Sequence, residues 1–178
     1  MRIIADIDIL ADETLRRRMV AWSCLLLAVG VACCALLLAT SGCAELGLGW
    51  LLWLVAGSLA ALPAHELVHA AAFKLLVPGA CVTFGVKDAF LYTSANGAVA
   101  RRSAELCVLL APSVLVTAVL VALAVAAGCP VLAAALAFAH LSGCAGDLLM
   151  CAEIVSEPDC THVADAEFGV VLLSDPDS

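Results

Sequence analysis

Charged residues are scarce in this chain. Asp, Glu, Lys and Arg make up 13% of its 178 residues, whereas 65% are hydrophobic, and the mean hydropathy is +1.12. An ordinary water-soluble domain carries about 25% charged residues, so this composition excludes one. We therefore expect an integral membrane protein whose first partner is the lipid bilayer.

Internal repeats are absent at the periods typical of solenoid proteins. The length suits one compact unit and leaves no room for a second domain of usual size. A single membrane-embedded domain is therefore expected over residues 1–178.

A surplus of positive charge is also missing, because the formal net charge is −8. The acidic residues gather at the end of the chain: Glu153, Glu157, Asp159, Asp165, Glu167, Asp175 and Asp177. So acidic a tail has no electrostatic reason to bind nucleic acid or anionic lipid. Nucleic acid is therefore not expected as a partner.

The chain has ten cysteines but no CxxC pair. Most of them lie within apolar runs, where cysteine behaves as a small buried hydrophobe. Only Cys43 and Cys129 fall in connections expected outside the cytoplasm, where oxidants can act, so a disulfide bridge between these two is one candidate.

Four long apolar runs cover residues 19–40, 48–77, 104–127 and 131–154. Each is long enough to cross about 30 Å of hydrocarbon at 1.5 Å per helical residue. Between the second and third runs, residues 82–93 alternate apolar and polar side chains and are rich in strand-favouring types. The predicted fold is therefore an all-α integral membrane protein of about four transmembrane helices, with a small cytoplasmic β-hairpin between the second and third.

Short strands are also expected outside the membrane. Ile3, Ile7 and Ile9 are spaced as in a short strand, and the apolar patch at residues 168–173 is a candidate strand in the acidic tail, residues 155–178. Its partner would be the hairpin or the amino-terminal segment.

All positive residues fall on one side of the membrane in this arrangement: Arg2, Arg16, Arg17, Arg18, Lys74, Lys87, Arg101 and Arg102. Short cytoplasmic loops carry an excess of Lys and Arg. A multi-pass protein of the cell membrane with both termini and the hairpin in the cytoplasm is therefore expected.

Residues 65–69 form a HExxH motif inside the second apolar run. His65 and His69, four residues apart, share one face of a helix and can bind one zinc ion, and Glu66 can serve as the general base. Ionisable side chains are costly near lipid, so they should be paired, metal-bound or facing a polar cavity. The motif therefore predicts a zinc hydrolase site with Zn²⁺ as its cofactor.

A catalytic zinc ion usually has three protein ligands, so one more is needed. His65 and Asp147 are equally far from the outer ends of the second and fourth runs, about 25 Å of helical rise in each case. Asp147 is the predicted third ligand. His140 is the alternative, as ligand or as hydrogen-bonding partner of a ligand, and Cys144 is expected to be a packing residue.

The HExxH motif, Phe84-Gly85, Tyr92, Ala111-Pro112, Ser142-Gly143, Gly146-Asp147-Leu148 and residues 165–169 together resemble the DUF3267 family of membrane zincins. That family is in turn similar to site-2-type intramembrane metalloproteases. Their pattern pairs HExxH with an aspartate on a later span, which implies His65, His69 and Asp147 as zinc ligands and Glu66 as the catalytic residue. The longer Asn-Pro-containing signature around that aspartate is absent here.

The resemblance implies hydrolysis of membrane-anchored or transmembrane peptide substrates near the cytoplasmic leaflet. Asn96 and Ser142 are the candidates for stabilising the oxyanion. Two other classes stay open, a zinc- or ion-binding transporter and a non-catalytic membrane scaffold, both of which would hold zinc without proteolysis.

Overall fold

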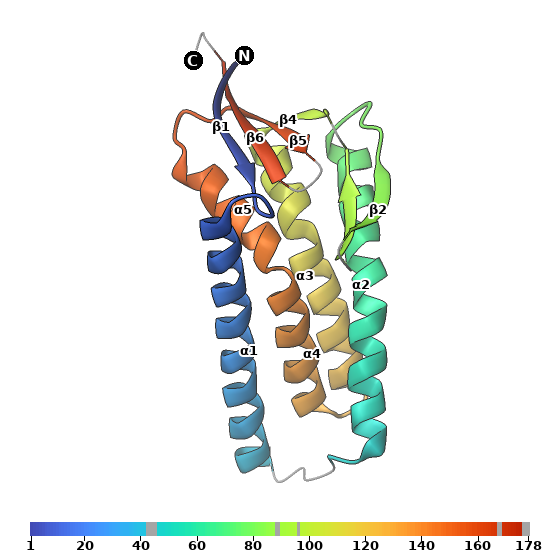
Figure 1. The fold of residues 1–178 in the computed structure, drawn as a ribbon. Coiled ribbons are helices and arrows are strands. Elements are labelled where there is room, and N and C mark those ends of the chain that lie inside the picture. Colours follow the sequence, from blue (N-terminus) through green and yellow to red (C-terminus); the bar gives the residue numbers. More distant parts are fainter. Residues whose placement is uncertain (42–45, 88–89, 96, 167–168, 176–178) are drawn as a thin grey trace.

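A computed structural model describes residues 1–41, 46–87, 90–95, 97–166 and 169–175. Its long helices run side by side, with strands gathered at one end of the bundle (Figure 1). The helices are α1 (Glu13–Ser41), α2 (Leu48–Leu76), α3 (Arg102–Ala126), α4 (Pro130–Gly143) and α5 (Ala145–Ser156). Three of them are long and apolar enough to cross a membrane, or up to four if α4 and α5 count as one span. The prediction of a mostly helical chain is thus confirmed, and against the predicted count of about four membrane helices the structure has three to four candidates.

The first helix begins earlier than the apolar run at residue 19. The carboxylate of Asp12 accepts hydrogen bonds from the backbone N–H groups of Thr14 and Leu15, at 2.7 and 3.1 Å. Such a cap satisfies N–H groups that have no partner within the helix, so the helix extends into the polar segment.

The prediction of one helix over residues 131–154 is wrong, because the chain bends by 56° between α4 and α5. The break is at Cys144, whose backbone N–H lies 3.1 Å from the carbonyl oxygens of both His140 and Leu141. Gly143 and Gly146 flank this position, and glycine is among the weakest residues in a helix interior. The bend directs α5 so that it packs against α3 and α1.

The all-α class also needs correction, since the strands form a four-stranded antiparallel sheet and a separate pair. The sheet has the order β1-β6-β5-β4, and β2 pairs with β3. The strands are β1 (Arg2–Asp8), β2 (Thr83–Lys87), β3 (Phe90–Ser94), β4 (Val99–Arg101), β5 (His162–Ala166) and β6 (Gly169–Ser174). The tail strand therefore pairs with the amino-terminal segment, for example Ile7 with Val170.

Packing of α1 against α4 is close. A Cβ atom at Gly30 would overlap the Phe138 side chain, so glycine permits this approach. The hydroxyl of Ser23 in α1 also donates to the carbonyl oxygen of Ser142, at 2.8 Å.

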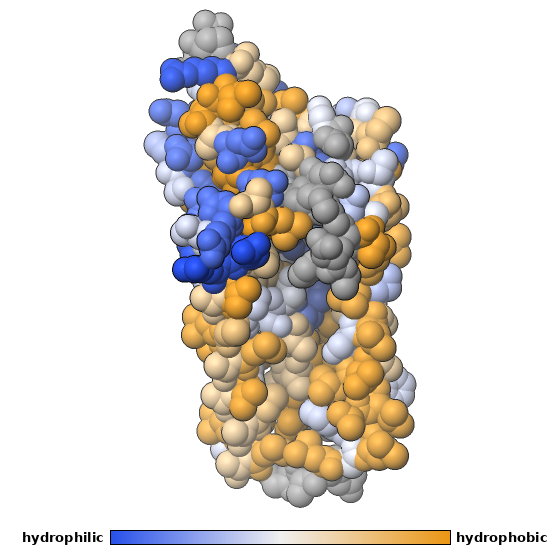
Figure 2. Space-filling model, viewed as in Figure 1, coloured by the Kyte–Doolittle hydropathy of each residue, from blue (hydrophilic) through white to orange (hydrophobic). Residues whose placement is uncertain are grey.

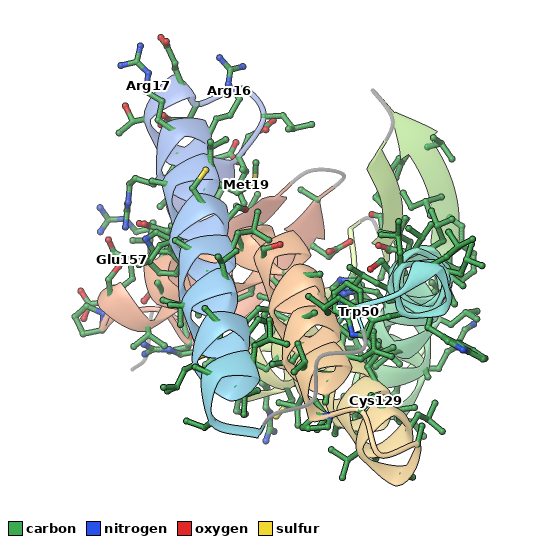
Figure 3. The ribbon with its side chains drawn as sticks, turned by 90° about the horizontal axis from the view of Figure 1, so that it is seen from below. Arg16, Arg17, Met19, Trp50, Cys129 and Glu157 are labelled. Atoms are coloured by element: carbon green, nitrogen blue, oxygen red, sulfur yellow. The ribbon has the colours of Figure 1, made fainter. Side chains whose placement is uncertain are left out.

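One buried cluster lies where the sheet meets the helices and includes Ile154, Val163 and Leu172. A second, around Ala124 and Leu136, lies near the opposite end of the bundle, and Trp50 and Cys129 pack against it (Figure 3). Of the two cysteines proposed to pair, Cys129 is free, and Cys43 lies outside the described residues.

The outer surfaces of the helices carry large exposed apolar side chains, among them Leu25, Trp53, Leu59 and Val119. Figure 2 shows apolar surface over the helical part and polar surface gathered toward the sheet end. In water such an apolar surface would be unfavourable, whereas lipid tails cover it at no cost. The chain therefore has the features of a multi-pass membrane protein.

Candidate metal centre

Helix α2 brings the two histidines of the motif together. Residues four apart lie one above the other on a helix, and the Nε2 atoms of His65 and His69 are 3.0 Å apart. Both rings are largely buried, with 14% and 9% of their side chains exposed. Their two ring nitrogens face a common point inside the protein.

Asp147 reaches the same point from the first turn of α5. Its Oδ2 atom is 3.1 Å from Nε2 of His65, and its Oδ1 atom is 3.6 Å from Nε2 of His69. The structure thus brings together the three residues that the sequence proposed as ligands, with donor atoms all within 4.8 Å of one another.

These donor separations fit a tetrahedral zinc ion. Ligand bonds of about 2.0–2.1 Å at tetrahedral angles place neighbouring donor atoms roughly 3.3–3.4 Å apart, and the three observed separations lie on either side of that value. Two imidazoles and one carboxylate are a donor set that zinc prefers, and they leave a fourth position open. The residues present therefore fit the metal.

The other ring nitrogen of His69 determines which tautomer is present. Its Nδ1–H donates to the backbone carbonyl oxygen of Val108 in α3, at 3.0 Å. A carbonyl can only accept, so the proton is on Nδ1 and the lone pair of Nε2 points toward Asp147 and His65. Hydrogen bonds from the second ring nitrogen commonly orient metal-binding histidines.

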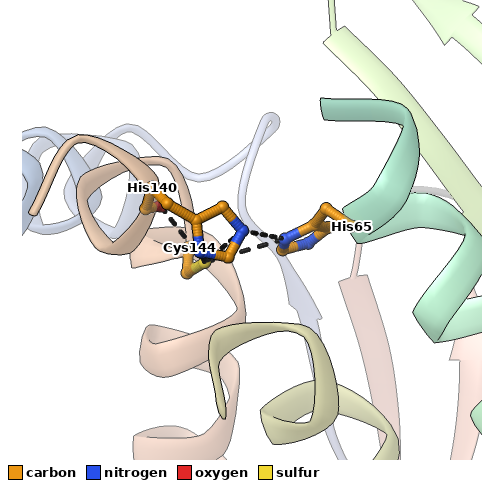
Figure 4. A group of neighbouring side chains, drawn as sticks. All are labelled: His65, His140 and Cys144. Atoms are coloured by element: carbon orange, nitrogen blue, oxygen red, sulfur yellow. Dashed lines mark hydrogen bonds between the residues drawn. The ribbon is translucent and has the colours of Figure 1, made fainter. Parts of the chain in front are cut away.

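The other ring nitrogen of His65 faces α4 and the bend. Nδ1 of His65 lies 3.4 Å from Nε2 of His140 and 3.7 Å from the sulfur of Cys144 (Figure 4). His140 was an expected neighbour of the ligands, whereas Cys144 was predicted only to pack. The four-residue spacing of His140 and Cys144 repeats that of His65 and His69, a signal in the sequence that could have found this pair.

A cavity of about 180 Å³ opens beside the cluster. It is lined on the helical side by His65, Glu66 and Asp147, and on the strand side by residues of β3, β5 and β6. Glu66, the predicted base, is half-buried in the cavity wall. A small reacting group therefore has room next to both the cluster and a carboxylate.

On the strand side of the cavity, β3 is hydrogen-bonded to the HExxH motif. The hydroxyl of Thr93 in β3 donates to the backbone carbonyl oxygen of Glu66, at 3.1 Å. At the end of β3, the Asp165 carboxylate accepts hydrogen bonds from the Ser94 hydroxyl at 2.8 Å and the Ala95 N–H at 2.7 Å. Burial nevertheless raises the pKa of Asp165 above that of an ordinary carboxyl.

Of the two predicted oxyanion donors, the structure describes Ser142. The Ser142 hydroxyl donates to the carbonyl oxygen of Ala139 at 2.7 Å, and Ser142 is not among the described residues that line the cavity. Asn96 lies outside the described residues.

Comparison with known families agrees with the donor set. The model of the DUF3267 family, described as "Putative zincin peptidase", matches residues 58–162, more than half of the chain. The chain belongs to the DUF3267 family. No match was found among curated proteins or among solved structures.

The DUF3267 match includes the whole donor cluster. It contains His65, Glu66, His69 and Asp147, together with His140 and Cys144 on the other side of His65. Helix α1, strand β1 and strand β6 lie outside the matched range. The family assignment therefore rests on the part of the chain that builds the site and is independent of the sheet edge formed by β1.

Proposed function

We propose that this DUF3267 protein is an intramembrane zinc metalloprotease that hydrolyses peptide bonds of membrane-associated substrates near the cytoplasmic leaflet. His65, His69 and Asp147 are the proposed zinc ligands, and Glu66 is the proposed catalytic base. The observation that carries the proposal is the spacing of the donor groups beside a cavity that Glu66 also lines. The Nε2 atoms of His65 and His69 are 3.0 Å apart, and the two carboxylate oxygens of Asp147 lie 3.1 Å from the first and 3.6 Å from the second.

Zinc, when bound, polarises a carbonyl group and lowers the pKa of a water molecule. The residues of the chain transfer the proton and hold the site in position. Glu66 accepts a proton from the attacking water and returns it to the leaving amine. The contact of His69 with Val108 keeps the imidazole in one orientation, and the Thr93 hydroxyl holds the backbone of Glu66 against β3.

Strand β3 is the proposed platform for the substrate. Among the described residues β2 is the strand that pairs with it, and Leu91, Tyr92 and Thr93 line the cavity. A helical peptide keeps its carbonyl groups in hydrogen bonds and must unwind before hydrolysis. Addition to the edge of β3 would hold an unwound segment extended next to Glu66.

The proposed orientation places the sheet end in the cytoplasm. The positive residues belong to β1, the first turns of α1, the last turn of α2, β2 and the junction of β4 with α3, all toward this end in Figure 1. The positive-inside rule then gives cytoplasmic termini in the cell membrane. The proposed ligand set, His65 and His69 with Asp147, follows the pattern of site-2-type proteases, in which an aspartate on a later span completes the HExxH site.

A non-proteolytic zinc-binding protein, either transporter or scaffold, is the second candidate function. The observation that favours it is the extra donor pair, His140 and Cys144, on the far side of His65. Both candidates bind zinc, so metal content alone does not separate them. Dependence of peptide hydrolysis on Glu66 separates the two candidates.

The test uses the purified full chain, reconstituted with a library of single-span peptides whose cleavage is read by mass spectrometry. Glu66→Gln should keep zinc and fold, because it preserves shape, but should lose about 10²–10⁴-fold in rate because it removes the base. Glu157→Gln, in the segment after α5, is the matched control and should retain wild-type activity. Equal rates in Glu66→Gln and wild type would exclude the mechanism, and zinc binding without any cleavage would favour the second candidate.

A further inference from the structure

His65 has donor groups on both edges of its ring. Nε2 faces His69 and Asp147, whereas Nδ1 faces Nε2 of His140 at 3.4 Å and the sulfur of Cys144 at 3.7 Å. The sulfur is 3.8 Å from the same nitrogen of His140. Three donor atoms from α2, α4 and the bend therefore form a second triangle, which Figure 4 shows.

The dimensions of this triangle match metal coordination. Zinc bonds of about 2.0–2.1 Å to nitrogen and 2.3 Å to sulfur at tetrahedral angles place two nitrogens roughly 3.3–3.4 Å apart, and a nitrogen and a sulfur roughly 3.6 Å apart. The observed separations are close to these values: 3.4 Å between the two nitrogens, and 3.7 and 3.8 Å from the sulfur to them.

The surroundings hold the donors in place. Nδ1 of His140 lies 2.8 Å from the Thr117 hydroxyl oxygen, so an Nδ1–H donated to Thr117 leaves Nε2 as the nitrogen that faces His65. The sulfur of Cys144 is about equally far from Nε2 and Nδ1 of this ring, at 3.8 and 3.9 Å. Cys144 is fully buried at the break between α4 and α5, where its position is set by the backbone. The nearby cavity is lined by His65 and Gly146, so it lies next to one member of the triangle.

We propose that His65, His140 and Cys144 form a second metal site, which binds a borderline or soft cation such as Zn²⁺. A thiolate and two imidazoles select such ions over Mg²⁺ or Ca²⁺, which prefer oxygen. His65 is shared, so its ring bridges the second site and the centre formed with His69 and Asp147.

Metal binding at the second site would release the thiol proton of Cys144, because the thiolate is the form of cysteine that binds a metal. Filling both sites would also release the ring proton of His65, since each of its two nitrogens would then bind a metal.

Cobalt binding to the purified full chain tests the proposal without any assay of proteolysis. Wild-type protein loaded with Co²⁺ should bind two equivalents and show a sulfur-to-cobalt charge-transfer band in the near ultraviolet. Cys144→Ala should bind one equivalent and lose the band, whereas the matched control Cys151→Ala, a buried cysteine on α5, should keep both. Asp147→Asn should keep the band, because its loss affects only the other centre.

Sulfur in the first shell of the metal can also be measured in the wild type by X-ray absorption, so the test does not depend on a variant that folds. One equivalent of cobalt with no sulfur neighbour in wild-type protein would overturn the second site and leave the His65, His69 and Asp147 centre intact. A charge-transfer band that persists in Cys144→Ala would overturn it as well. Failure of the proposed protease function would leave both readouts unchanged.

Discussion

Oδ2 of Asp147 lies 3.1 Å from Nε2 of His65, and this contact joins α2 to the first turn of α5. It depends on the 56° bend at Cys144, since the bend sets the direction in which α5 leaves α4. Asp147 belongs to the candidate metal centre by this geometry, and its role as a ligand can be tested directly.

Loss of a residue that only hydrogen-bonds to a metal ligand lowers metal affinity roughly 10–100-fold. Asp147→Asn should lower the zinc affinity by more than this, because it removes an anionic donor that binds the metal directly. Peptide hydrolysis should be lost with the metal. Zinc content of the purified protein and cleavage of single-span peptides provide the measurements. Asp159→Asn, an exposed carboxylate beyond α5, is the control. Full zinc occupancy and activity in Asp147→Asn would remove this residue from the site and make His140 the next candidate.

Zinc should also raise the thermal stability of the folded chain. A ligand that binds only the folded state at 100 times its dissociation constant stabilises by about 2.7 kcal/mol. His69→Ala should lose most of this gain, since it removes a donor that α2 and Val108 hold in position. Unfolding temperatures with zinc and with a chelator measure the difference. An equal zinc-induced shift in wild type and His69→Ala would argue against the centre.

Asp165 should make the stability of the metal-free protein fall as the pH rises. Burial raises the pKa of this carboxyl in the folded state above its usual value of about 3.9, so the folded state binds the proton more tightly than the unfolded state does. The resulting stabilisation is complete below the ordinary pKa and is lost as the pH rises through the folded pKa.

Asp165→Asn should flatten this part of the pH dependence, because the amide oxygen can still accept from Ser94 and Ala95 but cannot ionise. Unfolding between about pH 4 and 7 in the presence of a chelator makes the comparison. Parallel wild-type and variant curves across that range would contradict the prediction. Asp159→Asn again serves as the control for loss of a carboxylate.

A reporter fused after Ser178 should be cytoplasmic, because the Lys and Arg residues all belong to segments at the sheet end. A second fusion in the connection between α3 and α4, at Gly128, should be extracytoplasmic and provides the matched control. Activity of the carboxy-terminal reporter outside the cell would reverse the orientation and place the sheet outside.

Local features of the sequence determined the helices and the meeting of the two motif histidines on one helix face. Apolar runs long enough to cross a bilayer predict helices wherever they occur, and the four-residue spacing of His65 and His69 places both rings on one helix face. The apolar patches near the two termini were recognisable as strands for the same reason, since alternation and residue type are local properties. Counting along the second and fourth runs even placed Asp147 at the depth of His65.

Only the tertiary structure decided which of these elements meet. The pairing of β1 with β6 joins the two ends of the chain, and no periodicity within either segment specifies its partner. The bend at Cys144 arises from the packing of α4 and α5 around weak glycine positions, and it turns Cys144 and His140 toward Nδ1 of His65. Residue types and spacing can therefore indicate a zinc ligand set, but the surroundings of each ligand depend on contacts between helices that are distant in the sequence.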